Sequence, residues 1–151
     1  MMTTSPRTVT PGRSAAVFNR AVGWLARHGV SLYGSRLLAV RGRKSGEWRT
    51  VPVNPLSLDG ERYLLSPRGT TQWVRNLRAA GGDGELRIGR RTERFTADEV
   101  SDDDKPAVLR AYLRRWAWEV GVFFDGVSAA SPEETLREIA PGYPVFRLTS
   151  R

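Results

Sequence analysis

A short basic turn at residues 42–46 contains the side chains of this sequence best suited to binding an anion. Two glycines flank Arg43, Lys44 and Ser45, and Arg49 follows shortly after. Glycines let backbone N–H groups face a bound anion, the cations supply charge, and the serine hydroxyl supplies a directional hydrogen bond. The turn therefore predicts a phosphate-binding cradle, although a basic surface turn has the same composition. It is not a Walker A loop, because the G-x-x-x-x-G-K-[ST] spacing is absent.

A second segment, residues 66–69, has a similar character. It follows an expected strand, contains the cation Arg68 and a glycine, and leads into a short helix that carries Trp73. Exposed backbone amides beside a cation favour contact with an anionic or polar ligand. Trp73 and Leu77 are more typical of core residues than of ligand contacts.

The composition excludes most chemistry that relies on a protein's own reactive groups. The 151-residue chain has no cysteine, which excludes disulfides, thiolate catalysis, iron–sulfur clusters and cysteine zinc sites. Its one histidine, His28, cannot form a multi-histidine metal site within one chain, and we expect no metal. If the protein is an enzyme, a bound cofactor is expected to supply the reactive group.

The charge balance favours an anionic partner. Lys and Arg number 24 against 16 Asp and Glu, which gives a formal net charge of +8 and a pI near 10.9. Such a domain attracts nucleic acid, anionic membrane or a phosphorylated small molecule. A general preference for arginine accounts for the overall bias equally well. A further cluster, at residues 87–94, has no assigned role.

The remaining pattern predicts one α+β domain over residues 13–151, after a flexible leader at residues 1–12. Strands are expected at residues 37–40, 48–58, 62–65, 85–88, 92–100 and 144–148. Pro52 and Pro55 mark the second of these as an edge or bulged strand. Asp59-Gly60 is typical of a hairpin turn. Because hairpins join most strands, we expect an antiparallel sheet that curls toward a barrel.

Three or four helices are expected around this sheet. One lies between Ser14 and Gly29, one runs from a cap at Thr70 or Thr71 to Gly81, and one runs from a cap at Asp102 or Asp103 to Gly121. A short helix begins from a cap at Ser131. The first has a broad apolar face that either packs on the core or docks on a membrane surface. The sequence lacks a run of about 18 apolar residues, so no helix is expected to span a membrane. We expect the protein to be cytoplasmic, with membrane association through the first helix as an open alternative.

Residues 37–88 also resemble a known family. G-R-K-S-G follows a strand and precedes x-x-R-T, a proline-containing strand, D-G-E-R-Y, a strand-end glycine and W-V-R-N-L-R-A. This order is similar to the deazaflavin-dependent nitroreductase family of actinobacteria. The resemblance implies a mostly antiparallel, Greek-key-like split β-barrel related to flavin-binding oxidoreductases, with an N-terminal helix and flanking helices. It also implies coenzyme F-420, an 8-hydroxy-5-deazaflavin whose tail carries a phosphate and a polyglutamate.

The resemblance assigns cofactor-binding roles by position. In chain order, the first residues of the set are expected to contact the phosphate and tail. The later ones are expected to contact the ring or to brace the pocket. The set is Arg43, Lys44, Ser45, Gly46, Arg49, Thr50, Val51, Pro52, Ser66, Pro67, Arg68, Gly69, Trp73 and Asn76. The implied reaction transfers a hydride from the reduced deazaflavin to a quinone, an activated enone or a nitroaromatic.

Catalytic residues are not identified by the resemblance. Some members place a serine beside the reactive ring, and here that position falls on Pro67, with Ser66 as its neighbour. Tyr112 and Tyr143 are the other candidate hydroxyl donors. Some members have a tyrosine cluster around the substrate. In the corresponding region, residues 116–124, this chain has an aromatic stretch. From it, Trp118, Phe123 and Phe124 are candidates for the substrate pocket, or alternatively for core or dimer contacts.

Several alternatives stay open. FMN, with one phosphate, would suit the same cradle as the deazaflavin. The protein could bind either cofactor without turnover, or could be a basic nucleic-acid-binding module, although no RNP, KH or helix-turn-helix signature is present. The expected partner is otherwise a small hydrophobic or aromatic acceptor, with no nucleic acid, and the chain is a monomer or a homodimer.

Overall fold

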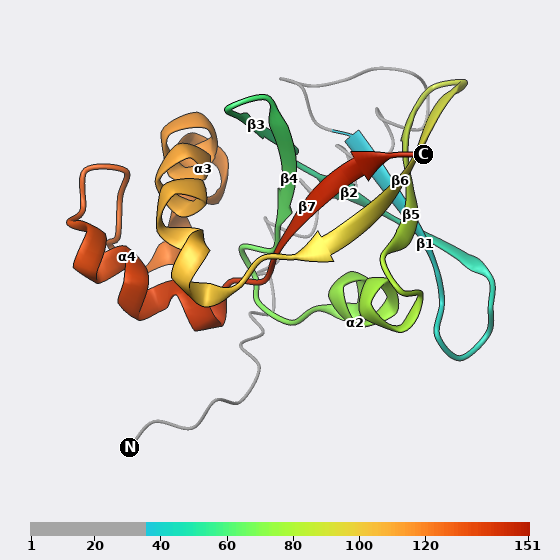
Figure 1. Ribbon diagram of the computed structural model, residues 1–151, viewed down its shortest axis with the longest axis horizontal. Coiled ribbons are helices and arrows are strands. Elements are labelled where there is room, and N and C mark those ends of the chain that lie inside the picture. The colour runs from blue at the N-terminus through green and yellow to red at the C-terminus, as the bar shows by residue number, and fades with distance from the viewer. Residues whose placement is uncertain (1–35) are drawn as a thin grey trace.

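The computed structural model describes residues 36–151, in which seven antiparallel strands form one curled sheet (Figure 1). The strands are β1 (Arg36–Arg41), β2 (Trp48–Val53), β3 (Leu56–Leu58), β4 (Glu61–Leu65), β5 (Asp83–Ile88), β6 (Arg91–Glu99) and β7 (Val145–Ser150). Their order across the sheet is β2-β1-β5-β6-β7-β4-β3. The expected α+β split-barrel fold is thereby confirmed.

The sheet curls because its two edge strands are neighbours in the chain. β2 and β3 lie at opposite ends of the strand order, yet only Asn54 and Pro55 connect them. Three Cα–Cα steps span about 11 Å at most, so the two edges must come close together. The prediction of one strand over residues 48–58 is wrong, because this connection divides it. The expected edge position is correct for both parts.

Turn residues at the hairpins behave as the sequence predicts. Asp59 and Gly60 have φ values of 51° and 79°, and they join β3 to β4 in register. Positive φ at both central residues matches the right-handed twist of the strands on either side. A second hairpin joins β5 to β6 around Gly89, as expected.

Within the described residues, three α-helices pack on the sheet: α2 (Gln72–Ala79), α3 (Lys105–Val120) and α4 (Glu133–Ile139). Apolar residues spaced three or four apart from Val108 to Val120 form the buried face of α3. Two expected helix starts are displaced. Asp102 belongs to a 3-10 turn, Asp102–Asp104, that precedes α3. Pro132 occupies the N-cap of α4 in place of Ser131, whose hydroxyl instead accepts a hydrogen bond from Ser128 N.

The core has two parts, one on either side of the sheet. One lies inside the barrel, around Leu38, Phe95 and Phe146, with α2 packed against it. The other lies between the sheet and the pair α3 and α4, around Leu109 and Trp116. Figure 1 shows α3 and α4 together at one end of the sheet and α2 below the barrel. The connection between β2 and β3 borders the second of these parts, since Trp116 Nε1 donates to Pro55 O at 3.2 Å.

The leader at residues 1–12, the first expected helix and His28 lie outside the described residues. Within residues 36–151, no helix is both long and apolar enough to cross a membrane.

A buried lysine links the start of α3 to the end of α4. The Lys105 side chain is 4% exposed, and its Nζ lies 2.6 Å from Asp102 Oδ1 and 3.0 Å from Ala140 O. Asp102→Ala leaves this ammonium group without its counter-ion, so we expect a loss of about 1–3 kcal/mol in the free energy of unfolding. Urea denaturation measures it. Asp103→Ala is the control because that side chain is 93% exposed, and equal losses in both variants would contradict the prediction.

Candidate functional site

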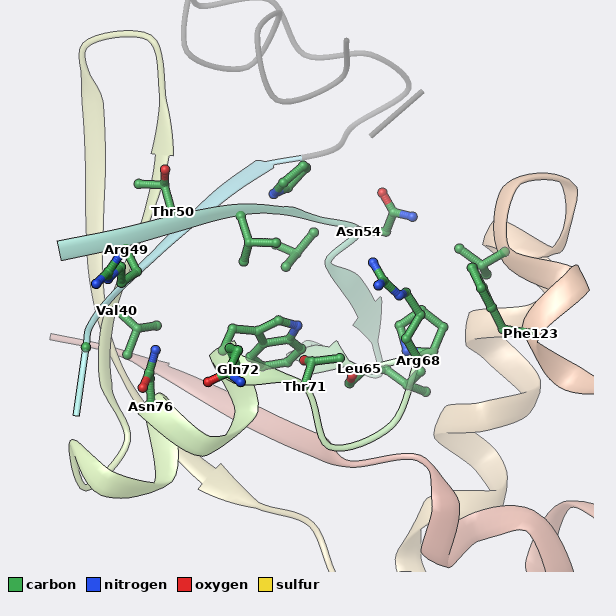
Figure 2. A pocket seen from close by; sticks show the side chains of 18 of the residues that line it. Val40, Arg49, Thr50, Asn54, Leu65, Arg68, Thr71, Gln72, Asn76 and Phe123 are labelled. Carbon is green, nitrogen blue, oxygen red and sulfur yellow. The ribbon is translucent and has the colours of Figure 1, made fainter. Parts of the chain in front are cut away.

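A cavity of about 680 Å³ lies between β2, the loop after β4, α2 and the end of α3. Figure 2 shows Arg49 and Thr50 on the β2 side, with Gln72 and Asn76 below them and Asn54, Arg68 and Phe123 at the other end. Every residue expected to bind the cofactor lines this cavity except Gly46 and Gly69. Two segments that are separate in the sequence, residues 42–49 and 66–76, are thus brought to one site.

Arg43 is held in place by α2. Its backbone N–H and its guanidinium both donate to Asn76 Oδ1, at 3.1 Å and 2.8 Å. The guanidinium also donates to Gln72 Oε1 at 2.9 Å. Asn76 is 6% exposed, so one buried amide oxygen ties the β1–β2 turn to the helix. Arg43 therefore shapes the cradle as well as contributing charge to it.

The turn itself is closed by short backbone hydrogen bonds. Gly42 N donates to Glu47 O at 2.7 Å, and Gly46 N donates to Gly42 O at 2.8 Å. Gly46 has a φ of +75°, a conformation that favours glycine. A Cβ at Gly42 would lie 3.0 Å from Ser45 Oγ. Gly46 thus contributes to the fold of the turn without lining the cavity, which accounts for its place in the motif.

The positive charge at this end of the cavity is not neutralised by neighbouring carboxylates. Among residues 36–151, Arg43, Lys44 and Arg49 form no ion pair. The arginine cluster at residues 87–94 differs, because Arg87 pairs with Glu85 at 2.8 Å and Arg94 pairs with Asp83 at 3.3 Å. Two arginines of that cluster are therefore balanced by surface carboxylates, whereas the cavity presents cations to a ligand.

Thr71 offers an unused hydrogen-bonding group at the cavity. Its Oγ1 is buried, and it has no hydrogen-bond partner among the described residues. It occupies the N-cap position of α2 but makes no side-chain cap hydrogen bond. Because a buried hydroxyl without a partner costs about 1–3 kcal/mol, a ligand with a polar edge fits this wall. The sequence indicates no more for Thr71 than a place, shared with Thr70, as a candidate helix cap.

The other end of the cavity holds a polar cluster that sequence analysis missed. Asn54, from the β2–β3 connection, hydrogen-bonds to both Tyr112 and Glu119 of α3. Burial raises the pKa of the Tyr112 hydroxyl, and the Asn54 hydrogen bond opposes this. Burial likewise raises the pKa of the Glu119 carboxyl, against the effects of Asn54 and Arg115. Arg68 lines the same region, and burial lowers the pKa of its guanidinium.

The candidate catalytic residues occupy different environments. Ser66 and Tyr112 line the cavity, but the Ser66 hydroxyl donates to Gly69 O at 2.5 Å. That hydrogen bond gives Gly69 a role in shaping the loop. Tyr143 is not a lining residue. Its hydroxyl donates to Phe123 O at 2.5 Å.

The aromatic stretch at the end of α3 contributes one side chain to the cavity. Phe123 lines it, whereas Phe124 is 1% exposed and stacks on Tyr143 with ring centroids 4.4 Å apart. Trp118 is 56% exposed, and its Nε1 donates to Arg115 O at 3.2 Å. Phe124 and Trp118 therefore do not line the cavity: the helix periodicity directs Trp118 outward, and the 3-10 turn Gly121–Phe124 directs Phe124 into the core.

Comparisons with known proteins identify similar structures. A protein described as a domain-swapped dimer is 15% identical, with a TM-score of 0.55 over 91% of this chain and 100% of that chain. An F-420-H2-dependent reductase, FDR-A, is 18% identical, with a TM-score of 0.50 over 77% and 94%. A protein of unknown function from Agrobacterium tumefaciens is 20% identical, with a TM-score of 0.57 over 97% and 59%. At these identities the likeness shows the fold alone.

A comparison with curated proteins gives no match. The sequence nevertheless matches a family model over residues 13–125, a range that contains both halves of the cationic site and extends through α3. The chain therefore belongs to the F-420H(2)-dependent quinone reductase family.

Proposed function

We propose that this protein transfers a hydride from reduced coenzyme F-420 to a small quinone, enone or nitroaromatic. The observation that carries the proposal is the cavity with Arg43, Lys44 and Arg49 at one end, none of them in an ion pair within residues 36–151. An anionic tail suits that end, and the family match supports a deazaflavin. A volume of about 680 Å³ is within the range of cofactor sites.

The residues present fit such a cofactor. Arg43, Lys44, Ser45 and Arg49 would hold the phosphate and the polyglutamate tail, since they combine charge with a directional hydroxyl. The buried Thr71 hydroxyl would gain the partner that it lacks among the described residues. When bound, the reduced deazaflavin supplies a hydride, so the protein itself needs no nucleophile.

The protein's own task is then to hold the reactants and to exclude water. The edge strand from Thr50 to Pro52 and the loop from Ser66 to Arg68 face one another across the cavity. In this proposal the flat ring of the cofactor lies between them. Val120 and Phe123 add apolar surface beside this gap, which favours an aromatic or quinonoid acceptor. Orienting two reactants in one cavity lowers the entropic part of the barrier.

A paired titration tests the proposal. Coenzyme F-420 and FMN are each added to the purified protein, and binding is followed by fluorescence. Oxidation of the reduced deazaflavin by menadione is then followed with and without protein. We expect saturable binding of the deazaflavin and acceptor-dependent oxidation. Binding without oxidation would indicate a carrier protein, tighter binding of FMN would indicate a flavin enzyme, and absence of deazaflavin binding would overturn the proposal.

Lys44→Glu tests whether the cationic end binds the tail. Lys44 lines the cavity and forms no ion pair in the described region. Reversing its charge should weaken deazaflavin binding about tenfold, and higher salt should reduce the difference. Arg75→Glu is the matched control, because Arg75 is exposed on α2 and does not line the cavity. An equal effect in both variants would assign the change to net charge alone.

A further inference from the structure

A carboxyl group lines the end of the cavity that lies away from the cationic turn. Glu119 lines the cavity at the end that also contains Tyr112 and Phe123, away from the cationic turn. It is half-buried, and the Asn54 side chain hydrogen-bonds to it. Asn54 also acts on the pKa of Tyr112, and all three side chains line the same cavity, so one amide lies beside both ionisable groups. Neither the family match nor the charge pattern accounts for an acid in this place.

We propose that Glu119 supplies the proton that completes reduction of the acceptor, with Asn54 as its positioning residue. This inference rests on the proposed function. A quinone that accepts one hydride becomes a hydroquinone anion. The O–H bond of the Glu119 carboxyl breaks, a new O–H bond forms on the anionic oxygen, and a neutral hydroquinone leaves. The carboxylate regains a proton from water, and water takes the proton released as the deazaflavin is oxidised, so atoms and electrons balance.

The two other hydroxyl groups of the cavity are less suited to this role. The Ser66 hydroxyl donates to Gly69 O, so its proton is engaged in the loop. Tyr112 is 1% exposed, and its raised pKa lies further from neutrality. An efficient proton donor has a pKa near the working pH and a route to solvent. The raised pKa of Glu119 moves toward neutrality, and its half-buried position permits exchange with water.

Two side chains act on the pKa of Glu119: Arg115 of the same helix, and Asn54 from the β2–β3 connection. Tyr112 of α3 and Arg68 from the loop after β4 are the other ionisable groups that line this end of the cavity. Arg115 and Asn54 favour the carboxylate, whereas burial disfavours it most strongly. Removal of the Asn54 amide should therefore raise the pKa of Glu119 further.

Glu119→Gln separates proton delivery from hydride transfer when two acceptors are compared. Menadione needs a hydride and a proton, whereas the N-methylphenazinium cation needs only a hydride to become neutral. We expect kcat with menadione to fall about 100-fold, whereas kcat with N-methylphenazinium and deazaflavin affinity stay near wild-type values. The wild-type rate with menadione should fall as pH rises through the pKa of Glu119, and the variant should lose this dependence. Glu138→Gln, an exposed substitution on α4, is the control.

A second readout needs no cofactor. In the ligand-free protein, the carboxyl ¹³C resonance assigned to Glu119 should titrate above its ordinary range, and Asn54→Ala should move the midpoint higher. Unchanged menadione turnover in Glu119→Gln, or an equal loss with both acceptors, would overturn the assignment. Failure of the wild-type protein to bind the deazaflavin or to reduce either acceptor would instead overturn the proposed function. A loss in Tyr112→Phe that matches the loss in Glu119→Gln would transfer the role to Tyr112.

Discussion

Gly82→Ala should destabilise the fold by about 2–5 kcal/mol, the sum expected for a left-handed residue with a Cβ and for the backbone shift that its neighbours must make. Gly82 has a φ of +87°, and a Cβ there would lie within 3.0 Å of Ala97 N and closer still to Ala97 O. Two hydrogen bonds fix this position. Gly82 N donates to Leu77 O at 2.9 Å, and Ala97 N donates to Gly82 O at 2.8 Å.

The neighbouring glycine is the matched control for this substitution. Gly81 also has a positive φ, of +65°, but a Cβ there would have no atom within 4 Å. Gly81→Ala should therefore cost only about 1–2 kcal/mol, from the backbone conformation alone. Urea unfolding of both variants measures the difference. Equal losses would show that the close approach of β6 to Gly82 adds nothing to the destabilisation caused by Gly82→Ala.

Asn76→Ala should weaken deazaflavin binding about 10- to 100-fold and should also lower stability by about 1–3 kcal/mol. Asn76 Oδ1 accepts two hydrogen bonds from Arg43, one of them from a guanidinium. A hydrogen bond to a charged group contributes about 1.5–3 kcal/mol, and tenfold in affinity corresponds to about 1.4 kcal/mol. Without this acceptor, the partly buried Arg43 N–H loses its partner and the cradle loses its fixed shape.

Asn76→Asp separates these two effects. The carboxylate keeps an acceptor for Arg43, so stability should stay close to that of the wild type. It also adds a negative charge beside the cationic end, so binding of an anionic tail should still weaken. Thermal unfolding and fluorescence titration of the same samples give both quantities. Normal deazaflavin affinity in Asn76→Ala would show that Arg43 does not need its tie to α2.

The parts of the fold that follow from local rules could be predicted from sequence. The Asp59-Gly60 hairpin depends on two residues that tolerate positive φ. The buried face of α3 depends on apolar spacing along one helix. By contrast, the split of residues 48–58 into β2 and β3 depends on barrel closure, which is a property of the whole sheet. Pro52 and Pro55 indicated that this segment lies at an edge of the sheet. They did not indicate that its two halves lie at opposite edges.

The cationic half of the site was predictable for a similar reason. Its residues lie within two short segments, and the G-R-K-S-G motif gathers glycines, cations and a hydroxyl in one turn. Asn54 and Glu119 come from distant elements and stand in no motif, so nothing local marks them as neighbours. Glu119 does fall within the apolar stretch at the end of α3. A charged residue there, three positions after the buried Trp116, was the available signal.

The short connection between β2 and β3 holds the two edges of the curled sheet close together. A ligand in the cavity contacts β2 on one side of the opening and the loop after β4 on the other. It would therefore bridge the opening and resist its widening. Bound cofactor should stabilise the whole sheet by mass action, and the largest gain in rigidity should fall on β2 and β3. Asn54 lies in that connection, so bound cofactor would also restrict the motion of Asn54, the proposed positioning residue for Glu119.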